Sequence, residues 1–337
     1  LKDKNVTNAA VFGVIPSTGE ILIYQGSKDF FATDIDGQVD VIQALRQPWS
    51  TLKPFLYYLA LENWAYPDDL IIDIESEYNS FQEDTVYISE NYSLKEYGLV
   101  RLKKALWNSF NNASVRLARE IWLEKIYDFY VDIWFELTET AKHYGYSLVL
   151  WNPSITLESL VLWYRNLFED LDNPSSYMLY DILSDPDNRD ISFWVNSILS
   201  TRIPQAVKTG TSSDFRNNLV LSYHPDLVLW VWVGNNDNSS MKWVTGITGA
   251  GYIWQQVIEK ATDLWYIRQG TIETPEGLVE KSYCLDENCF RTENIIASPK
   301  KKFYSAIADD IYASEDIFEE LDSYEIEKLN QLWVDIQ

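Results

Sequence analysis

Strand-like sequence stands near the start of this chain and again after residue 200, with helix-like sequence between. Residues 9–15 and 20–25 are apolar, β-branched runs around Pro16-Ser17-Thr18-Gly19, the pattern of a hairpin with a longer turn. Three more runs with short turns follow at residues 206–211, 219–223 and 227–233. The sequence therefore predicts an α+β fold with one antiparallel sheet, assembled from two distant parts of the chain and carrying a large helical insertion.

The insertion spans residues 39–198, where apolar residues mostly recur at helical spacing. The clearest predicted helices are residues 52–62, 99–110, 113–130 and 156–167. A further helix is predicted at residues 252–264, after the last strand. An acidic helix is predicted at residues 315–328, where the charges are those of a solvated face.

Composition excludes several classes of function. The 337 residues carry 27 Lys and Arg against 51 Asp and Glu, a net charge of −24, which argues against nucleic acid and anionic membranes as partners. There are two histidines, and His224 lies in the turn-like Tyr-His-Pro-Asp. A Ser-His-Asp triad and a histidine metal site are therefore poorly supported, and we expect no metal and no cofactor.

Three short motifs carry the chemistry. The first is Ser50-Thr51-Leu52-Lys53, where the serine follows Pro48 at the start of a predicted helix. The unpaired N–H groups and positive dipole end of a helix favour developing negative charge there. Lys53 lies three residues on and shares a helix face with Ser50. A buried lysine with cationic neighbours has a depressed pKa and can accept a proton.

The other two motifs supply groups that such a reaction needs. In Ser109-Phe110-Asn111 a hydroxyl can relay a proton and an amide can hold a substrate carbonyl. In Lys208-Thr209-Gly210-Thr211 the lysine offers charge to a carboxylate, and the glycine lets a ligand approach a strand edge. The backbone N–H groups of Ser50 and Thr211 are the candidate oxyanion hole.

Each motif has a plainer explanation when taken alone. The first could be a capping serine with a solvent-facing lysine, the second helix punctuation, and the third an edge strand protected by a lysine. The order and local contexts of all three together favour a serine acyl-transfer site with lysine as its base. Cys284 and Cys289 are separated by four residues. They could form a small disulfide loop outside the cytoplasm or remain two free thiols.

The motifs and their surroundings resemble the transpeptidase domain of class A penicillin-binding proteins, most closely the group termed 1C. The supporting strings are Asp36-Gly37-Gln38-Val39-Asp40, Arg46-Gln47-Pro48, Asp181-Ile182-Leu183-Ser184-Asp185, Ala206–Thr211 with Ser212, and Pro275-Glu276-Gly277-Leu278. The resemblance implies a five-stranded antiparallel sheet flanked by helices. It implies a transpeptidase domain at 1–270, with an α/β lobe (1–38 and 200–270) and a helical lobe (39–199). Residues 271–337 would form a C-terminal extension.

The resemblance also implies an activity. Ser50 would attack a D-alanyl-D-alanine stem peptide, an amine of a second stem peptide would resolve the acyl-enzyme, and β-lactams would acylate the same serine. The implied location is the extracytoplasmic face of the bacterial cytoplasmic membrane. Because Leu1 opens directly onto strand-like sequence, we expect a missing upstream part that holds a membrane anchor and a glycosyltransferase domain. The alternatives are a D,D-carboxypeptidase, a serine β-lactamase, or a non-catalytic β-lactam or peptidoglycan sensor.

Tryptophan stands where glycine is expected. The resembling family has glycine immediately before the serine, and this chain has Trp49. With 13 Gly and 14 Trp in the chain, glycine is scarce against an average near 7%. The same replacement is suspected at nine further positions: Trp64, Trp107, Trp122, Trp134, Trp151, Trp163, Trp194, Trp230 and Trp243. We hypothesise that the source organism reads UGA as glycine and that the codons were translated as tryptophan. The alternative is a truly tryptophan-rich chain whose indole crowds Ser50.

Overall fold

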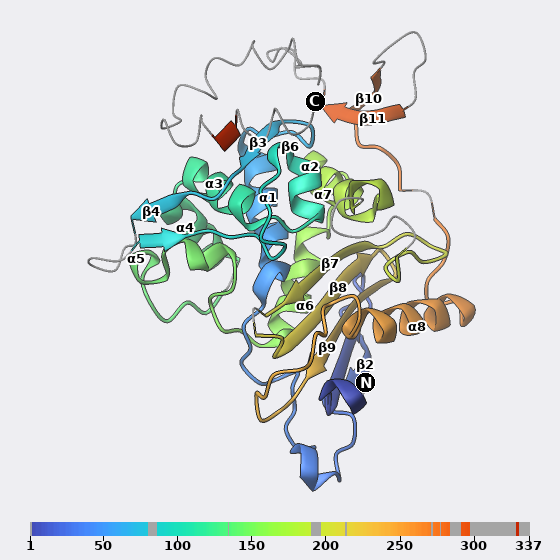
Figure 1. The fold of residues 1–337 in the computed structure, drawn as a ribbon. Helices are drawn as coiled ribbons and strands as arrows, with labels where there is room; N and C mark the ends of the chain where they lie inside the picture. The colour runs from blue at the N-terminus through green and yellow to red at the C-terminus, as the bar shows by residue number, and fades with distance from the viewer. Residues whose placement is uncertain are drawn as a thin grey trace.

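The computed structural model describes residues 2–79, 86–133, 135–189, 197–212, 214–270, 272–276, 278–283, 291–296 and 328–329. Its centre is a five-stranded antiparallel sheet in the order β2-β1-β9-β8-β7 (Figure 1). The strands are β1 (Asn8–Val14), β2 (Ile21–Gln25), β7 (Ala206–Thr211), β8 (Asn217–His224) and β9 (Leu227–Gly234). The predicted sheet from two distant parts of the chain is confirmed, and β1 lies directly beside β9, with Phe12 opposite Trp230.

Both faces of the sheet are covered by helices. Every residue of β9 is buried, which explains why its sequence is a continuous apolar run rather than an alternating one. On β8, the Ser222 hydroxyl accepts a hydrogen bond from Trp254 Nε1 of α8 (Ala250–Asp263) at 2.7 Å. The next residue, Tyr223, donates to the Phe168 carbonyl at the end of α6 (Leu157–Leu167) at 3.0 Å. Since successive strand residues face opposite sides, α6 and α8 lie on opposite faces (Figure 1).

The remaining helices gather at one end of the sheet (Figure 1). They are α1 (Lys53–Asn63), α2 (Leu102–Trp107), α3 (Asn111–Ile121), α4 (Leu123–Asp132), α5 (Ala141–Tyr144) and α7 (Pro174–Ser184). Aromatic rings tie them together: Phe55 of α1 makes edge contacts with Tyr130, Phe135 and Tyr164 at 5.4–6.5 Å between ring centroids. Short 3-10 turns complete the lobe, among them η3 (Trp49–Leu52), which leads into α1, η4 (Gly145–Val149) and η5 (Pro186–Arg189).

Two predicted helices differ from the structure. The segment predicted as one helix at 99–110 begins as strand β6 (Gly98–Arg101), because it pairs with β3 (Leu70–Asp73), and becomes helical only in α2. The segment predicted as one helix at 113–130 is broken into α3 and α4 at Trp122, whose φ is +77°. A second small hairpin, β4 (Glu77–Asn79) with β5 (Val86–Ile88), also lies in the region predicted to be helical.

The suspected tryptophans divide into groups by backbone conformation. Trp49, Trp122 and Trp243 have φ of +53°, +77° and +55°, in the left-handed region that favours glycine. Trp265, which the sequence leaves undecided, has φ of +65°. The φ angles of Trp64, Trp107, Trp151, Trp163 and Trp230 are not positive, and Trp134 and Trp194 lie outside the described residues. Backbone geometry therefore supports the glycine hypothesis at three of the ten positions.

The last part of the chain holds one described hairpin, β10 (Leu278–Tyr283) with β11 (Arg291–Ile296). Cys284 and Cys289 lie outside the described residues, as does the helix predicted at 315–328 apart from Lys328. The five sheet strands fall within 1–38 and 200–270, but the lobe and domain boundaries stay a prediction. Within the described residues, no helix combines the length and apolar character needed to cross a bilayer.

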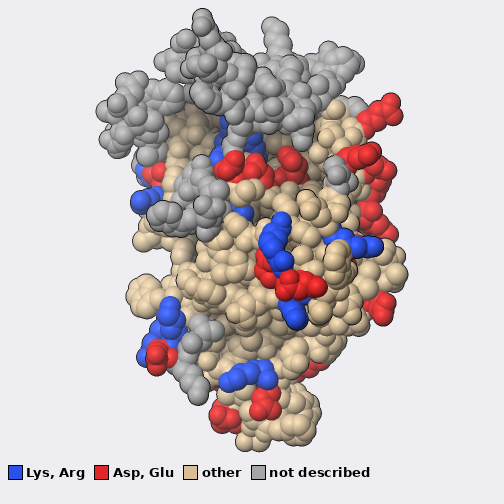
Figure 2. Space-filling view, turned by 90° about the vertical axis from the view of Figure 1, so that its right-hand side faces the viewer, with Lys and Arg blue, Asp and Glu red and all other residues tan. Residues whose placement is uncertain are grey.

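Acidic side chains gather on the upper right of the face in Figure 2, and several basic ones lie beside acidic neighbours. This pattern agrees with the net charge of −24. Arg202 forms ion pairs with Glu259 and Asp263 of α8.

Candidate active site

Ser50 lies in the 3-10 turn η3, immediately before α1. The chain leading to it is fixed by a two-residue bridge in which the backbones of Arg46 and Ile155 exchange hydrogen bonds of 2.9 Å. Behind the serine, the Tyr164 hydroxyl donates to the Thr51 carbonyl at 2.8 Å. The turn that presents Ser50 is therefore held from both sides by the helical lobe.

Lys53 points into the protein rather than into solvent. Its side chain is fully buried, and Nζ donates to the Ser109 carbonyl at 2.7 Å and to Asn111 Oδ1 at 2.7 Å. A longer contact of 3.4 Å reaches the Ser109 hydroxyl. The first two sequence motifs therefore meet through the lysine amine, which excludes the solvent-facing lysine of the plainer explanation.

Lys208 approaches the same hydroxyl from the sheet. It is fully buried on β7, and its Nζ donates to Ser109 Oγ at 2.9 Å and to the Thr209 carbonyl at 3.0 Å. Ser109 itself has φ of +63°, a strained conformation for a non-glycine residue and one that clusters at functional sites. All three motifs thus converge on Ser109 at the junction of sheet and helical lobe.

Burial and like charge both act on the two amines. Burial, together with repulsion from Lys208, holds the pKa of Lys53 well below its usual value, although the charge of Asp73 opposes that shift. Burial lowers the pKa of Lys208 to about 7. An amine with a depressed pKa can be neutral near physiological pH and can accept a proton from a hydroxyl.

Strand β7 offers an open edge beside Ser50. It is the outer strand of the sheet, and the Ser212 N–H just beyond it donates to the Asn217 carbonyl at 3.0 Å. Because N–H groups alternate in direction along an antiparallel strand, the Thr211 N–H points to the open edge. Gly210 lies against η3, where an added Cβ would sit 3.2 Å from both the Pro48 carbonyl and a Thr51 methyl.

The Ser50 hydroxyl is not part of this network. Among the described residues nothing makes a hydrogen bond to it, so the structure brings together Lys53, Ser109, Asn111 and Lys208 but leaves the serine free. Catalytic hydrogen bonds in unliganded enzymes are often long and tighten only with substrate. In this arrangement the Lys53 amine can accept a proton from Ser50, which lies one turn away. The Ser109 hydroxyl can pass a proton between the amines of Lys53 and Lys208.

Trp49, directly before Ser50, fits this turn poorly. Besides its positive φ, its Nε1 is buried without a hydrogen-bond partner, which typically costs about 1–3 kcal/mol. Its ring lies 6.2 Å from that of Trp151 between centroids. The residue next to Ser50 therefore carries both backbone strain and a donor that has no partner among the described residues.

Two residues that the motifs do not include lie behind the site. Asp73 ends β3, and Asn91 precedes β6; both are buried and hydrogen-bonded to each other at 2.7 Å. An available signal was the acidic residue closing the apolar run Leu70-Ile71-Ile72. Burial raises the pKa of Asp73 to about 6, although hydrogen bonds and Lys53 lower it.

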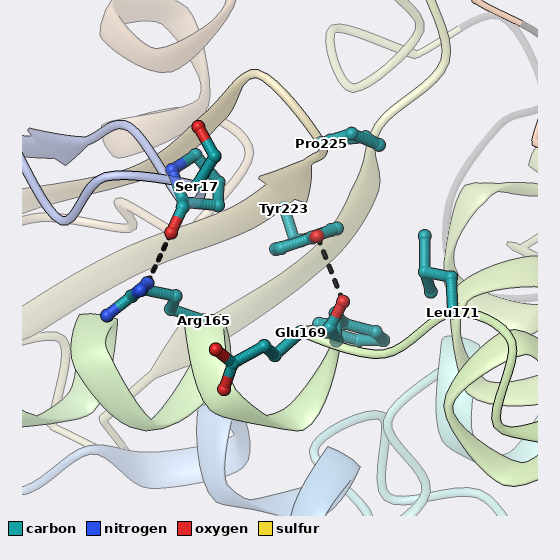
Figure 3. Close-up of a pocket in the computed structure, with 8 residues that line it drawn as sticks. Ser17, Arg165, Glu169, Leu171, Tyr223 and Pro225 are labelled. Atoms are coloured by element: carbon teal, nitrogen blue, oxygen red, sulfur yellow. Dashed lines mark hydrogen bonds between the residues drawn. The ribbon is translucent and has the colours of Figure 1, made fainter.

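A separate cavity of about 390 Å³ lies away from these residues, beside the β8–β9 turn (Figure 3). Arg165 Nε donates to the Pro16 carbonyl on one side, and the Tyr223 hydroxyl donates to Phe168 on the other. Tyr223 pairs with Ala206, at the end of β7 opposite to Thr211. The cavity is therefore separate from the site formed by Lys53, Ser109 and Lys208.

Comparisons with known proteins agree with the fold. Residues 10–146 match the family model described as the penicillin-binding protein transpeptidase domain. The structure is similar to penicillin-binding protein 1A from Haemophilus influenzae, with a TM-score of 0.72 at 16% identity, over 86% of this chain and 53% of that one. It is also similar to PonA1 from Mycobacterium tuberculosis in complex with penicillin V, with a TM-score of 0.64 at 17% identity, over 79% of this chain and 80% of that one. At these identities the likeness shows the fold.

Curated relatives are named penicillin-binding protein 1A. The protein from Rickettsia bellii is 27% identical over 67% of this chain and 34% of its own length. The one from Aquifex aeolicus is 26% identical over 78% of this chain and 39% of its own length. The chain thus spans little more than a third of these relatives, and the narrower assignment to the 1C group stays a prediction. Residues 10–146 of this chain thus match the transpeptidase domain of the penicillin-binding proteins, and the relatives that the chain resembles are of the 1A type.

Proposed function

We propose that this chain is a peptidoglycan D,D-transpeptidase with Ser50 as its nucleophile. The observation that carries the proposal is the meeting of two buried lysines, Lys53 and Lys208, at the hydroxyl of Ser109, one turn from Ser50 and beside the open edge of β7. A structural role alone explains poorly why two amines should be buried within reach of one hydroxyl, because burying like charges is costly.

In the acylation step, Ser50 Oγ attacks the carbonyl carbon between the last two D-alanines of a donor stem peptide. A bond forms between Oγ and that carbon, and the peptide C–N bond breaks. Lys53 accepts the hydroxyl proton, and the Ser109 hydroxyl relays a proton to the leaving D-alanine amine. An amine of a second stem peptide then attacks the ester carbon, a C–N bond forms, and the C–O bond to Ser50 breaks. The proton lost by that amine returns to Ser50 Oγ through Lys53, and the crosslink is released. These steps use protein groups alone and require no cofactor.

The substrate would lie along β7. An extended peptide can pair with an open strand edge, here at Thr209, Gly210 and Thr211, and Lys208 would attract the terminal carboxylate. The Ser50 and Thr211 N–H groups would stabilise the oxyanion, a contribution of about 10²–10³ in rate for each donor in comparable sites. Asn111 would hold a substrate carbonyl through its amide, which in the unliganded structure donates to the Glu90 carbonyl at 2.7 Å.

The names of the relatives support the substrate class. They are penicillin-binding proteins, and PonA1 is described in complex with penicillin V. We extend both β-lactam binding and a cell-envelope location, on the outer face of the cytoplasmic membrane, to this chain as part of the proposal. Glycan polymerisation would belong to a separate upstream domain.

Labelling with a fluorescent penicillin tests the proposal. Stable covalent labelling that is lost in Ser50→Ala is expected, whereas an unlabelled protein would favour a pseudoenzyme. A sensor that binds β-lactams would also be labelled stably, so the label alone does not distinguish it from a transpeptidase. Rapid loss of the label would point to a β-lactamase. Crosslinking of a stem-peptide donor to an acceptor is the second assay, since release of D-alanine without a crosslinked product would indicate a D,D-carboxypeptidase.

A further inference from the structure

The first turn of α3 is capped by side chains from elsewhere in the fold. The residue at its N-cap position is Phe110, which has no side-chain acceptor, and the helix begins with Asn111. The first N–H groups of a helix have no partner within it and need acceptors when they are buried. Because Asn111 belongs to the proposed site, whatever satisfies these groups also sets where its amide points.

Asn91 and Asp73 supply acceptors for the first three N–H groups of α3. Asn91 Oδ1 accepts from the N–H of Asn111 at 2.6 Å and of Asn112 at 3.4 Å. Asp73 Oδ1 accepts from the N–H of Ala113 at 3.1 Å. The two capping residues are joined by the bond from Asn91 Nδ2 to Asp73 Oδ2. Three consecutive N–H groups are thus held by one buried pair.

The pair is itself rigidly held. Asp73 Oδ2 also accepts from the Tyr97 N–H at 3.1 Å, and Asn91 Nδ2 also donates to the Lys95 carbonyl at 2.9 Å. Neither side chain can rotate away without leaving buried polar groups unpaired, which is costly. The Asp73 carboxylate accepts hydrogen bonds from Asn91, Tyr97 and Ala113, which are all donors. In Asp73→Asn the NH₂ group of the new side chain would face at least one of these donors.

We propose that Asp73 and Asn91 are positioning residues for acyl transfer, which fix the start of α3 so that Ser109 and Asn111 meet Lys53. This inference rests on the proposed function. Neither residue touches the reacting atoms; both act through the backbone of α3. The position of the start of α3 affects Lys53 directly, because Lys53 donates to the Ser109 carbonyl and to Asn111 Oδ1.

Asp73 has a second, electrostatic effect. The charged groups that act on Lys53 are Lys208 of β7, which lowers its pKa, and Asp73 of β3, which raises it. The neighbours Ser109 and Asn111 are neutral. Tyr57, one turn along α1, also senses the Asp73 charge. Removing that charge should therefore lower the pKa of Lys53, which a cap with a purely structural role elsewhere in the fold would not do.

The experiment compares Asn91→Ala and Asp73→Asn with a matched control, Asn173→Ala. Asn173 caps α7 by accepting from the N–H groups of Ser175 and Ser176. That helix has 11 residues, as α3 does. Asn173 lies at the N-terminal end of α7. Leu183, whose carbonyl accepts a hydrogen bond from Trp107 of α2, lies at the other end. Loss of the Asn173 cap should lower Tm on the order of 2–4 °C. Asn91→Ala should lower it further, because that side chain also bonds to Asp73 and to the Lys95 carbonyl.

The rate of acylation by a fluorescent penicillin distinguishes a positioning role of Asn91 from a purely structural capping role. Asn91→Ala should lose about 10²-fold in that rate, as small misplacements of catalytic groups do, while Asn173→Ala keeps the wild-type rate. In Asp73→Asn the acidic limb of the pH–rate profile should move to lower pH. Equal rates in Asn91→Ala and Asn173→Ala, or an unmoved acidic limb, would overturn this inference alone. Absence of labelling in the wild-type protein would overturn the proposed function with it.

Discussion

Lys53 and Lys208 share one hydrogen-bond acceptor, the hydroxyl of Ser109, at 3.4 Å and 2.9 Å from their Nζ atoms. Both amines are buried, so two positive charges at this distance from one oxygen repel each other strongly. Burial and repulsion from Lys208 hold the pKa of Lys53 well below its usual value, and burial lowers the pKa of Lys208 to about 7. The pair can therefore hold one neutral amine, one turn from Ser50, while the other amine carries the charge beside the strand edge.

Replacing Lys53 by methionine should separate catalysis from stability. Lys53→Met keeps a similar volume and removes the proton acceptor, so the acylation rate with a fluorescent penicillin should fall about 10²–10⁴-fold. Lys53→Arg should not restore it, because a guanidinium stays protonated. Thermal unfolding measured alongside should show that both variants are folded. Wild-type acylation by the arginine variant would contradict the role of Lys53 as a base.

The dependence of acylation on pH should be bell-shaped. Below the pKa of Lys53 the base is protonated and the rate falls as pH decreases. Above about 7, the pKa of Lys208 in the free protein, the cation that attracts the substrate carboxylate is lost and the rate falls as pH increases. Measuring the second-order acylation rate reports the free enzyme. In Lys208→Arg the alkaline limb should disappear, and a limb that persists there must come from another group.

The sheet and the motif residues could be predicted because their signals are local. Strands β1, β7 and β9 are short apolar runs bounded by turns, and Ser50 and Lys53 lie within one turn of each other. The pair Asp73 and Asn91 could not be predicted in the same way. Their contacts with Ala113 and Asn111 join residues 40 and 20 positions apart, and neither belongs to a recognisable motif.

The errors in the helical region have a related cause. Residues 99–101 are apolar and basic, which suits the start of a helix as well as a strand; pairing with β3 decides in favour of the strand. The break between α3 and α4 depends on the positive φ of Trp122, a conformation that a glycine at this position would have signalled and a tryptophan conceals. The β3–β6 pairing and the tryptophan at position 122 thus explain the two helices that local periodicity predicted wrongly.

Gly210→Ala should impair catalysis more than stability. The added Cβ would lie 3.2 Å from the Pro48 carbonyl and from a Thr51 methyl group, so β7 and the turn bearing Ser50 must move apart by a few tenths of an ångström. Acylation should fall at least about 10-fold, since rates are sensitive to such shifts. Gly270→Ala is the control, because nothing lies within 4 Å of its added Cβ. Equal acylation by the two variants would show that the contact is unimportant.

The residue at position 49 is the last prediction. Trp49 has φ of +53° and a buried Nε1 without a partner, whereas glycine adopts this conformation freely. Relief of left-handed strain amounts to about 1–2 kcal/mol, and the entropy cost of glycine to about 0.5–1 kcal/mol. Trp49→Gly also removes the packing of a half-buried indole against the core, so the relieved strain should keep the free energy of unfolding within about 1 kcal/mol of the starting protein in a denaturant titration. The substitution should raise the acylation rate, because the indole no longer crowds the turn that carries Ser50.

The control for this substitution is Trp254→Gly. Trp254 is fully buried, and its Nε1 donates to Ser222, so glycine there should cost about 3–5 kcal/mol as other large core truncations do. Peptide mass spectrometry of the protein from its native cells gives the decisive measurement. Glycine is expected at positions 49, 122 and 243, where φ is positive, with tryptophan retained at 254. Tryptophan at position 49 in that protein would refute the recoding hypothesis. The strained indole beside Ser50 would then be a native feature.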